Sequence, residues 1–138
     1  MSDSLRVIEG LTSIQSSFGP KETMDRLEAE IRARGLNVFA RIDHAAGAAE
    51  VGVPLAPTDL IIFGNARGGT PLMQAAQTAG IDLPLKVLVW QDEAGKTWLS
   101  YNEPIWIARR HVVGGRSEVV DKLTAALTAI VRGAADSR

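Results

Sequence analysis

The chain has 138 residues, of which 46% are hydrophobic and 22% are charged, and this size and composition indicate a single globular domain over residues 1–138. Its 15 Lys and Arg residues nearly balance its 16 Asp and Glu residues, which argues against nucleic-acid binding and against attraction to anionic membranes. Cysteine is absent and the apolar runs are far shorter than the roughly 20 residues of a membrane span, so we expect no disulfide, no sulfur-ligated zinc site, no membrane insertion and a cytoplasmic location.

The N-terminal part of the chain predicts two strands around one helix. We expect residues 1–9 to be frayed, and the polar but β-permissive residues 10–18 to form a strand. Pro20 suits a first helical position, and apolar residues then recur at helical spacing up to Gly35. The alternation in residues 37–43 predicts a half-buried strand. Its apolar side is expected to comprise Val38, Ala40 and Ile42.

A short apolar run and a glycine-rich turn follow. Residues 59–63 (DLIIF) predict a central strand, and residues 64–69 predict the turn that leaves it. Thr70 is a suitable N-cap and Pro71 a suitable first helical residue, so a second helix is predicted to begin there and to end at Gly80.

The C-terminal part predicts a hairpin and a last helix. Residues 84–90 and 97–101 read as strands joined by the turn at residues 92–96. Ser117 can cap a final amphipathic helix that ends at Gly133, with residues 134–138 frayed. Because a hairpin cannot belong to a purely parallel sheet, we predict an α+β fold: a mixed or antiparallel β-sheet of about five strands with helices packed mainly on one face.

Four segments resemble the hallmark segments of the domain-of-unknown-function 302 family, in the order and spacing of that family. They are Ile42–His44 (IDH), Phe63–Met73 (FGNARGGTPLM), Asp82–Gln91 (DLPLKVLVWQ) and Thr97–Pro104 (TWLSYNEP). The resemblance implies a compact bacterial α+β domain that associates as a homodimer, and it carries over no reaction, substrate or cofactor. Relatives often have proline where this chain has Ala66, which implies a more mobile connection here.

The sharpest local motif is the connection Gly64–Pro71 (GNARGGTP). It has the GxxxxG spacing of a phosphate-binding loop, but it lacks the lysine and hydroxyl residue that should follow, which argues against nucleotide hydrolysis. Free amides at a helix N-terminus, together with the guanidinium of Arg67, still favour a site for a small anion. The structural alternative is that Gly68 and Gly69 supply positive φ angles while Thr70 caps the helix.

Three other polar residues are candidates for the same site. His44 follows a strand and could act as a base, although a partly buried histidine bonded to backbone explains it as well. Tyr101 and Asn102 close the second hairpin strand and could line a cleft. The candidate ligand-binding residues are therefore Asn65, Arg67, Gly68, Gly69, Thr70, His44, Tyr101 and Asn102. The basic residues around His111 are interpreted as a solvated turn. Two distant histidines and no cysteine give no reason to expect a metal or another cofactor.

Three functions of different classes follow. The first is a dimeric module that binds or senses a small anionic ligand. The second is an enzyme with His44 as general base and Tyr101 or Asn102 positioning the substrate, which requires these side chains to converge on one bound atom. The third is a homodimer without a ligand, joined through the sheet or through its aromatic residues, among them Trp90 and Trp98.

Overall fold

A single antiparallel sheet organises the chain. The computed structural model describes residues 7–137, so most of the segment expected to be frayed, residues 1–9, lies outside the described residues. The sheet has five strands in the order β1-β5-β4-β3-β2, and every neighbouring pair is antiparallel. The strands are β1 (Leu11–Gln15), β2 (Asn37–Asp43), β3 (Thr58–Gly64), β4 (Leu85–Gln91) and β5 (Thr97–Asn102). The predicted α+β class is confirmed, and the sheet is antiparallel throughout.

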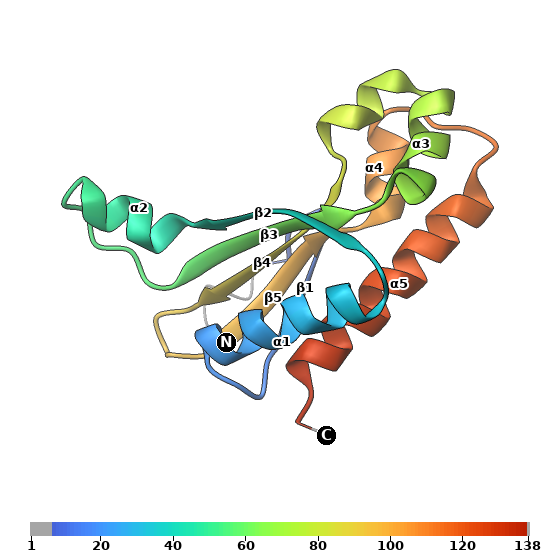
Figure 1. Cartoon of the computed structure of the whole chain (residues 1–138). Helices are drawn as coiled ribbons and strands as arrows, with labels where there is room; N and C mark the ends of the chain where they lie inside the picture. Colours follow the sequence, from blue (N-terminus) through green and yellow to red (C-terminus); the bar gives the residue numbers. More distant parts are fainter. Residues whose placement is uncertain (1–6, 138) are drawn as a thin grey trace.

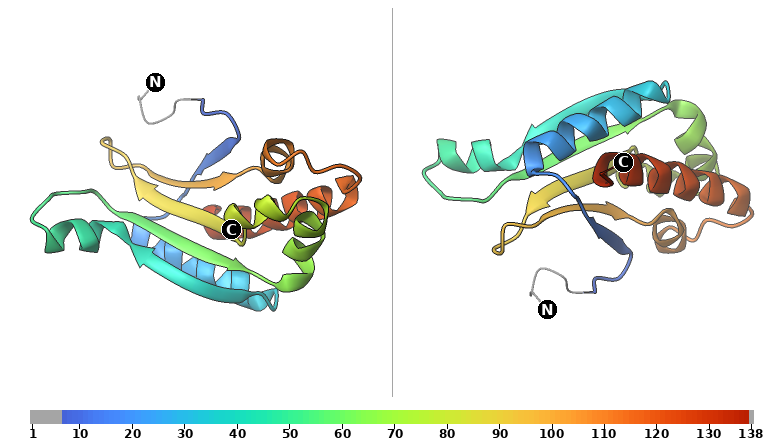
Figure 2. Two further views of the ribbon diagram at one scale, coloured as in Figure 1. Left: turned by 90° about the horizontal axis from the view of Figure 1, so that it is seen from above. Right: turned by 90° about the horizontal axis from the view of Figure 1, so that it is seen from below.

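The helices lie mainly on one face of this sheet. They are α1 (Pro20–Ala33), α2 (His44–Glu50), α3 (Ala66–Ala75), the 3-10 helix η2 (Gln77–Ile81), α4 (Pro104–Arg110) and α5 (Ser117–Ala135). Seen from below, α1 and α5 lie side by side across the strands, whereas from above the strands are in front and α3 sits at one end (Figures 1 and 2). We call the side under α1 and α5 the covered face and the opposite side the open face.

The main core fills the covered face. Met24, Leu27 and Ile31 of α1 project onto the sheet at helical spacing and are fully buried. From the other side they meet strand and α5 residues that are likewise excluded from solvent. These include Ile61, Phe63, Val87, Leu99, Leu127 and Ile130. Burial of this kind contributes about 1.5–3 kcal/mol for each large apolar side chain, so the covered face stabilises the fold.

An arginine joins the two helices of the covered face. Arg26 of α1 donates hydrogen bonds to the carbonyls of Gly133, Ala134 and Asp136 at 3.0–3.1 Å, and its guanidinium lies 4.1 Å from the ring centre of Phe18. The end of α5 is therefore anchored: the helix runs to Ala135, with Ala134 and Ala135 fully buried. The expected fraying from residue 134 is wrong for these two residues.

A bulge in β2 reverses the side on which its residues lie. The register with β3 shifts between Val38 and Ala40, so Phe39 is an extra residue. Val38 packs against the core of the covered face, while Ala40 pairs with Ile62 and Ile42 with Leu60, which point to the open face. The predicted single apolar side of this strand is thus wrong, because one inserted residue exchanges the two faces beyond it.

Two short helices were not anticipated from the sequence. Helix α2 begins at His44, where Asp43 accepts a hydrogen bond from the amide of Ala46 at 2.9 Å. With the loop that follows, it forms a projection from the body of the protein, which we call the arm (residues 42–57; Figure 1). Helix α4 begins at Pro104 and packs against α5. Proline suits a first helical position, and here it starts a helix directly after a strand.

Candidate functional site

The connection from β3 to α3 is helical earlier than predicted. Asn65 is the N-cap of α3, and its side-chain oxygen accepts a hydrogen bond from the Gly68 amide at 2.9 Å. The prediction that Thr70 caps this helix is therefore wrong, and Pro71 lies inside the helix rather than at its first position. The positive φ angles expected at Gly68 and Gly69 are also wrong, because in this connection the positive φ, 145°, belongs to Gly64.

The two glycines inside α3 have a different role, which is close packing. A Cβ on Gly68 would lie 3.3 Å from the Cδ2 of Leu123 in α5, and one on Gly69 would lie 3.6 Å from Leu83. Their lack of side chains leaves a cavity between the start of α3 and α5, which we call the β3–α3 hollow. Its volume is about 190 Å³. The lining comprises Leu36, Gly64, Asn65, Gly68, Gly69, Leu83, Pro84, Leu85, Lys122, Leu123 and Ala126.

The β3–α3 hollow is apolar in its walls and positive at its rim. Leucine side chains from three separate parts of the chain form the walls, and Lys122 and Asn65 are the lining residues with polar side chains. The N-terminus of α3 adds the partial positive charge of its first-turn amides. None of the lining residues is acidic. The arrangement therefore suits a small molecule with a hydrocarbon part and a negatively charged end.

The sequence-predicted residues near this turn divide between the hollow and the outer surface. Asn65, Gly68 and Gly69 line the hollow together. Arg67 and Thr70 are exposed and are not among its lining residues. Asn65, Gly68 and Gly69 are spaced at i, i+3 and i+4 and so share one side of the first turn of α3, whereas Arg67 and Thr70 fall outside that side.

His44 lies far from this turn. The pairing of β2 with β3 sets Asn37 against Gly64 and Asp43 against Asp59, so His44 follows the opposite end of the hairpin. Six residues of strand separate the two ends, roughly 20 Å. His44 is also exposed on the arm rather than partly buried, so the expected backbone-bonded histidine is wrong as well.

Tyr101 and Asn102 occupy opposite faces of β5. Tyr101 is buried in the core of the covered face, and both Tyr101 and Asn102 are among the residues that line a cavity of about 300 Å³ on the open face. Strands β2 and β5 are separated by β3 and β4, a distance of roughly 14 Å. His44, Tyr101 and Asn102 therefore do not converge on one bound atom, and the enzyme proposed from the sequence loses its required geometry.

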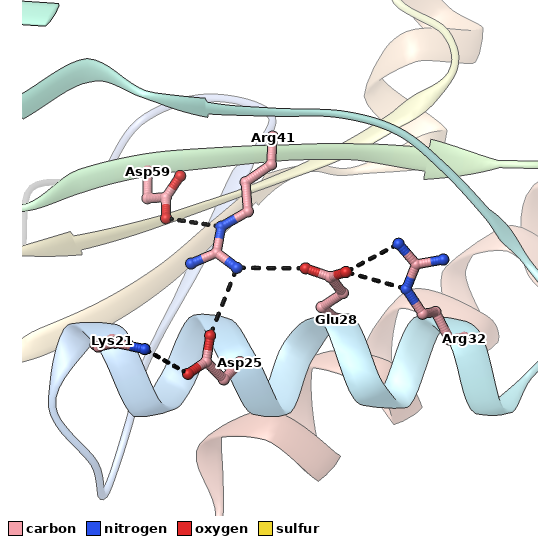
Figure 3. A network of polar contacts seen from close by, with 6 residues as sticks. All are labelled: Lys21, Asp25, Glu28, Arg32, Arg41 and Asp59. Atoms are coloured by element: carbon pink, nitrogen blue, oxygen red, sulfur yellow. Dashed lines mark hydrogen bonds and ion pairs between the residues drawn. The ribbon is translucent and has the colours of Figure 1, made fainter. Parts of the chain in front are cut away.

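A network of charged side chains ties α1 to the strands on the covered side (Figure 3). Its members are Lys21, Asp25, Glu28, Arg32, Arg41 and Asp59. The guanidinium of Arg41 is central: its Nε donates to Asp59 at 3.1 Å and its NH1 lies 3.3 Å from Glu28. Each cation faces a carboxylate, so the network holds α1 against β2 and offers no free charge to a ligand.

These contacts perturb the acid strengths in the network. A hydrogen bond from Lys21 lowers the pKa of Asp25, and one from Arg32 lowers the pKa of Glu28. Burial opposes the charge of Arg41, but its carboxylate neighbours outweigh that effect and raise its pKa. The remaining oxygen of Asp59, Oδ1, is buried without a hydrogen-bond partner among the described residues. The ion pair with Arg41 offsets the cost of that unpaired oxygen.

A second polar cluster joins η2 to the end of α4. His111 Nε2 lies 2.6 Å from Asp82 Oδ2, and its Nδ1 lies 2.9 Å from the hydroxyl of Thr78. Arg110 bonds both oxygens of Asp82 at 2.9 Å. Burial alone would raise the pKa of Asp82, but the hydrogen bonds from His111 and Arg110 are stronger and lower it. The side chain of His111 is only 8% exposed, so its interpretation as part of a solvated turn is wrong.

The hydroxyl–imidazole–carboxylate order of this cluster resembles that of hydrolase triads, but its surroundings differ. Thr78 does not line the β3–α3 hollow, and the carboxylate of Asp82 is bound by Arg110 as well as by His111. The cluster lies beside a small second core made by Leu72, Ala79, Ala108 and Val120. We assign it to holding η2 and α4 together rather than to catalysis.

Sequence reasoning missed the residues that reach the hollow from elsewhere. Lys122 and Leu123 come from α5, and Leu36 follows α1. Lys122 belongs to the polar side of an amphipathic helix, and no local pattern distinguishes it from other solvated lysines. The one available signal was the Gly-Gly pair, which can mark a close approach of another element as well as a turn.

Two further observations concern metals and membranes. Within residues 7–137, no group of three or more His, Asp or Glu side chains is placed to hold a metal ion. Over the same range, no helix combines the length and the apolar character needed to cross a bilayer.

The chain matches part of several longer bacterial proteins. It is 49% identical over 113 residues to "Fluoride-specific ion channel FluC 1" of Brucella suis biovar 1, and this stretch is 82% of our chain and 44% of that protein. The protein of the same name in Brucella abortus biovar 1 and "Fluoride-specific ion channel FluC 2" of Brucella melitensis biotype 1 match at the same identity over 42% of their length. The chain thus spans less than half of these relatives.

A solved structure and a family model agree on the fold. The crystal structure of an uncharacterised conserved DUF302 protein from Bacillus stearothermophilus superposes with a TM-score of 0.82 over 92% of our chain and 99% of that chain, at 20% identity. The model of the family described as "Domain of unknown function DUF302" matches residues 12–130, which include β1 to β5 except for the first residue of β1. With most of the chain matched in this way, the protein belongs to the DUF302 family.

Proposed function

We propose that this domain binds a small amphipathic carboxylate in the β3–α3 hollow and serves as a ligand-binding or sensing module. The observation that carries the proposal is a cavity with apolar walls that is lined by Asn65, the N-cap of α3, and by Lys122. A carboxylate is favoured at a helix N-terminus by about 0.3–1 kcal/mol, and more when the contact is partly buried. The apolar walls contribute affinity only if the ligand has a hydrocarbon part.

The cap residue sets how the anion would be held. The Gly68 amide is already bonded to Asn65, so the first-turn amides left for an anion are those of Ala66 and Arg67, which lie at the start of α3 beside the hollow and are not among its lining residues. Arg67 is exposed and would add its guanidinium only from outside the hollow. This differs from the phosphate-binding loop that the glycine spacing suggested, because the glycines here create room rather than donate a ring of amides.

Asn65→Asp is the sharpest test. Aspartate is as good an N-cap as asparagine, so the apo protein should unfold at an unchanged or slightly higher temperature. Its negative charge would, however, repel a carboxylate at the rim. We expect heteronuclear NMR titration of the wild type with butyrate or hexanoate to shift the amide signals around residues 64–69, and the variant to lose these shifts.

A second variant, tested with hexanoate and with its neutral counterpart hexanamide, separates the contribution of the ligand's charge from that of its shape. Lys122→Met should weaken binding of hexanoate about fivefold, equivalent to roughly 1 kcal/mol, and should leave binding of the neutral hexanamide unchanged. Lys21→Met is the control, because Lys21 is exposed on α1 and pairs with Asp25. If neither the carboxylate nor the amide shifts any signal near the hollow, the proposal is rejected.

The relatives favour a second candidate, a role in fluoride handling. Three longer proteins that contain a segment 49% identical to this chain carry the name fluoride-specific ion channel. Fluoride could bind the same first-turn amides without using the apolar walls. Titration with sodium fluoride against sodium chloride tests this: amide shifts at Ala66 and Arg67 specific to fluoride would support the second candidate, and equal responses to the two salts would reject it.

A further inference from the structure

A second cavity adjoins the β3–α3 hollow. Its volume is about 180 Å³, and we call it the side pocket. Three residues line the side pocket alone, namely Phe39, Ala66 and Met73. Four more line both cavities, and these are Asn65, Gly69, Leu83 and Pro84. The hollow and the side pocket therefore meet at the start of α3 and at the loop that precedes β4.

Gly69 lies where the two cavities meet. A Cβ on Gly69 would be 3.6 Å from the Cδ1 of Leu83, which lines both cavities, and 3.7 Å from the Cε of Met73, which lines only the side pocket. Both are ordinary van der Waals distances, so an added methyl group would fit and would fill the gap between these two side chains. The φ angle of Gly69 is not positive, so its backbone does not require glycine. The missing side chain thus leaves space between the hollow and the side pocket.

The bulge in β2 supplies the side pocket with an aromatic residue. Phe39 is the extra residue of the bulge, and it is 55% exposed rather than packed in the core. Bulges often re-aim a side chain toward a functional site. Here the bulge sets Phe39 beside residues of α3 in the wall of the side pocket. An aromatic ring that the fold does not bury is available to a hydrocarbon ligand.

Met73 gives the side pocket an adaptable wall. Its side chain lies between two glycines, because a Cβ on Gly69 would be 3.7 Å from its Cε and one on Gly80 would be 3.2 Å from its Sδ. Methionine has three rotatable bonds and a polarizable sulfur, and it fills irregular apolar gaps. With no side chain on either neighbour, Met73 has room to change its conformation around a bound hydrocarbon chain.

The two cavities differ in charge. Among the described residues that line them, Lys122 is the one with a charged side chain, and it belongs to the hollow. The three residues that line the side pocket alone are apolar. A charged group loses hydration in apolar surroundings, whereas a hydrocarbon chain gains by leaving water. The carboxylate of a ligand therefore belongs near Lys122, and its hydrocarbon end belongs in the side pocket.

We propose that the β3–α3 hollow and the side pocket form one site for a straight-chain fatty carboxylate longer than hexanoate. The carboxylate lies at Lys122, and the chain passes Gly69 and ends between Phe39 and Met73. Gly69 is the residue that determines specificity for chain length, because any larger side chain would fill the space through which the chain passes. This inference rests on the proposed function and extends it by naming the class of ligand.

NMR titration of the full chain with butyrate and with octanoate tests the inference. Octanoate has four more methylene groups, and each fully buried methylene strengthens binding about fourfold. Because Ala66 and Pro84 are exposed and leave the side pocket partly open to solvent, we expect octanoate to bind about twentyfold more tightly than butyrate. The methyl signal of Met73 and the ring signals of Phe39 should shift with octanoate and not with butyrate.

Two variants test the path of the chain. Gly69→Ala should lower the ratio of the butyrate to the octanoate dissociation constant from about twenty to about three, while its melting temperature stays unchanged or rises, because alanine favours a helix more than glycine does. Gly47→Ala is the matched control: it makes the same change inside α2, no described heavy atom lies within 4 Å of the added Cβ, and the ratio should stay at its wild-type value. Phe39→Ala should lower the ratio about fivefold, and because Phe39 is exposed, this variant keeps the inference falsifiable if Gly69→Ala disturbs α3.

The outcomes separate this inference from the proposed function. If butyrate shifts the amide signals of residues 64–69 but octanoate binds no more tightly, the joined site is wrong and the proposed function stands. A ratio that neither Gly69→Ala nor Phe39→Ala changes would also overturn the joined site, because the chain would then lie elsewhere. If neither carboxylate shifts any signal near the hollow, the proposed function and this inference are both rejected.

Discussion

The two faces of the sheet carry apolar side chains of the same kinds, yet only one of the two faces is covered by helices and forms a core. On the covered face, Ile61 and Phe63 are fully buried under α1 and α5, whereas Leu60 and Ile62 of the same strand remain half-buried on the open face. Alternation along β3 decides which residues share a face, and the helices decide which face becomes a core. The stability of the single chain therefore resides mainly in the covered face, and the open face is left without a covering helix.

The largest expected effect comes from truncation on the covered face. Ile130 of α5 is fully buried, so Ile130→Ala should lower the free energy of unfolding by about 2–5 kcal/mol. Leu88→Ala on the open face should cost about 1 kcal/mol or less when urea unfolding is measured at low protein concentration, where association does not contribute. Equal losses for the two variants would contradict the division between the faces.

An intermediate effect is expected where the two covering helices are tied together. Arg26→Ala removes three hydrogen bonds to the end of α5 and should cost about 1–3 kcal/mol in urea unfolding. Arg32→Ala is the control, because the pair of Arg32 with Glu28 is largely exposed and should contribute at most about 0.5 kcal/mol. A cost for Arg26→Ala no larger than for Arg32→Ala would show that apolar packing alone holds α5 on the sheet.

The smallest expected effect depends on pH. It concerns the polar cluster of Thr78, Asp82, Arg110 and His111, which joins η2 to the end of α4. Because His111 and Arg110 lower the pKa of Asp82 below 3.8, the stabilisation is present above that value and is lost as the pH falls through the folded-state pKa. At neutral pH the wild type should be more stable than Asp82→Asn by about 1 kcal/mol. This difference should shrink in acid unfolding, and a difference independent of pH would assign it to packing.

Much of the fold could be predicted from the sequence because its strands have clear local patterns. The hairpin around the turn at residues 92–96 and the strand Asn37–Asp43 agree with the structure to within a residue. Other features follow from single local contacts that no periodicity reveals. The bulge at Phe39 exchanges the faces of β2 without changing its composition, and α2, with the sequence HAAGAAE, has no apolar stripe to indicate a helix.

The candidate site was predicted less well, because its residues are gathered by tertiary structure. The glycine pair belongs to the connection that lines the hollow, but the cap by Asn65 moved the helix start and left Thr70 and Arg67 outside the hollow. Lys122 is more than fifty positions away in the chain, and only the packing of α5 against α3 brings it there. His44, Tyr101 and Asn102 are polar residues at strand ends, and the strand order places His44, which follows β2, far from Tyr101 and Asn102 of β5.

The place of β1 at the edge of the sheet has a consequence for the order in which the chain folds. Strands β2, β3, β4 and β5 pair with their neighbours in sequence, but β1 pairs with β5, joining Leu11 to Asn102. Closing so long a loop costs conformational entropy that is recovered only when the rest is in place. We expect the four-stranded meander and its helices to assemble first, with β1 docking late as the rate-limiting step.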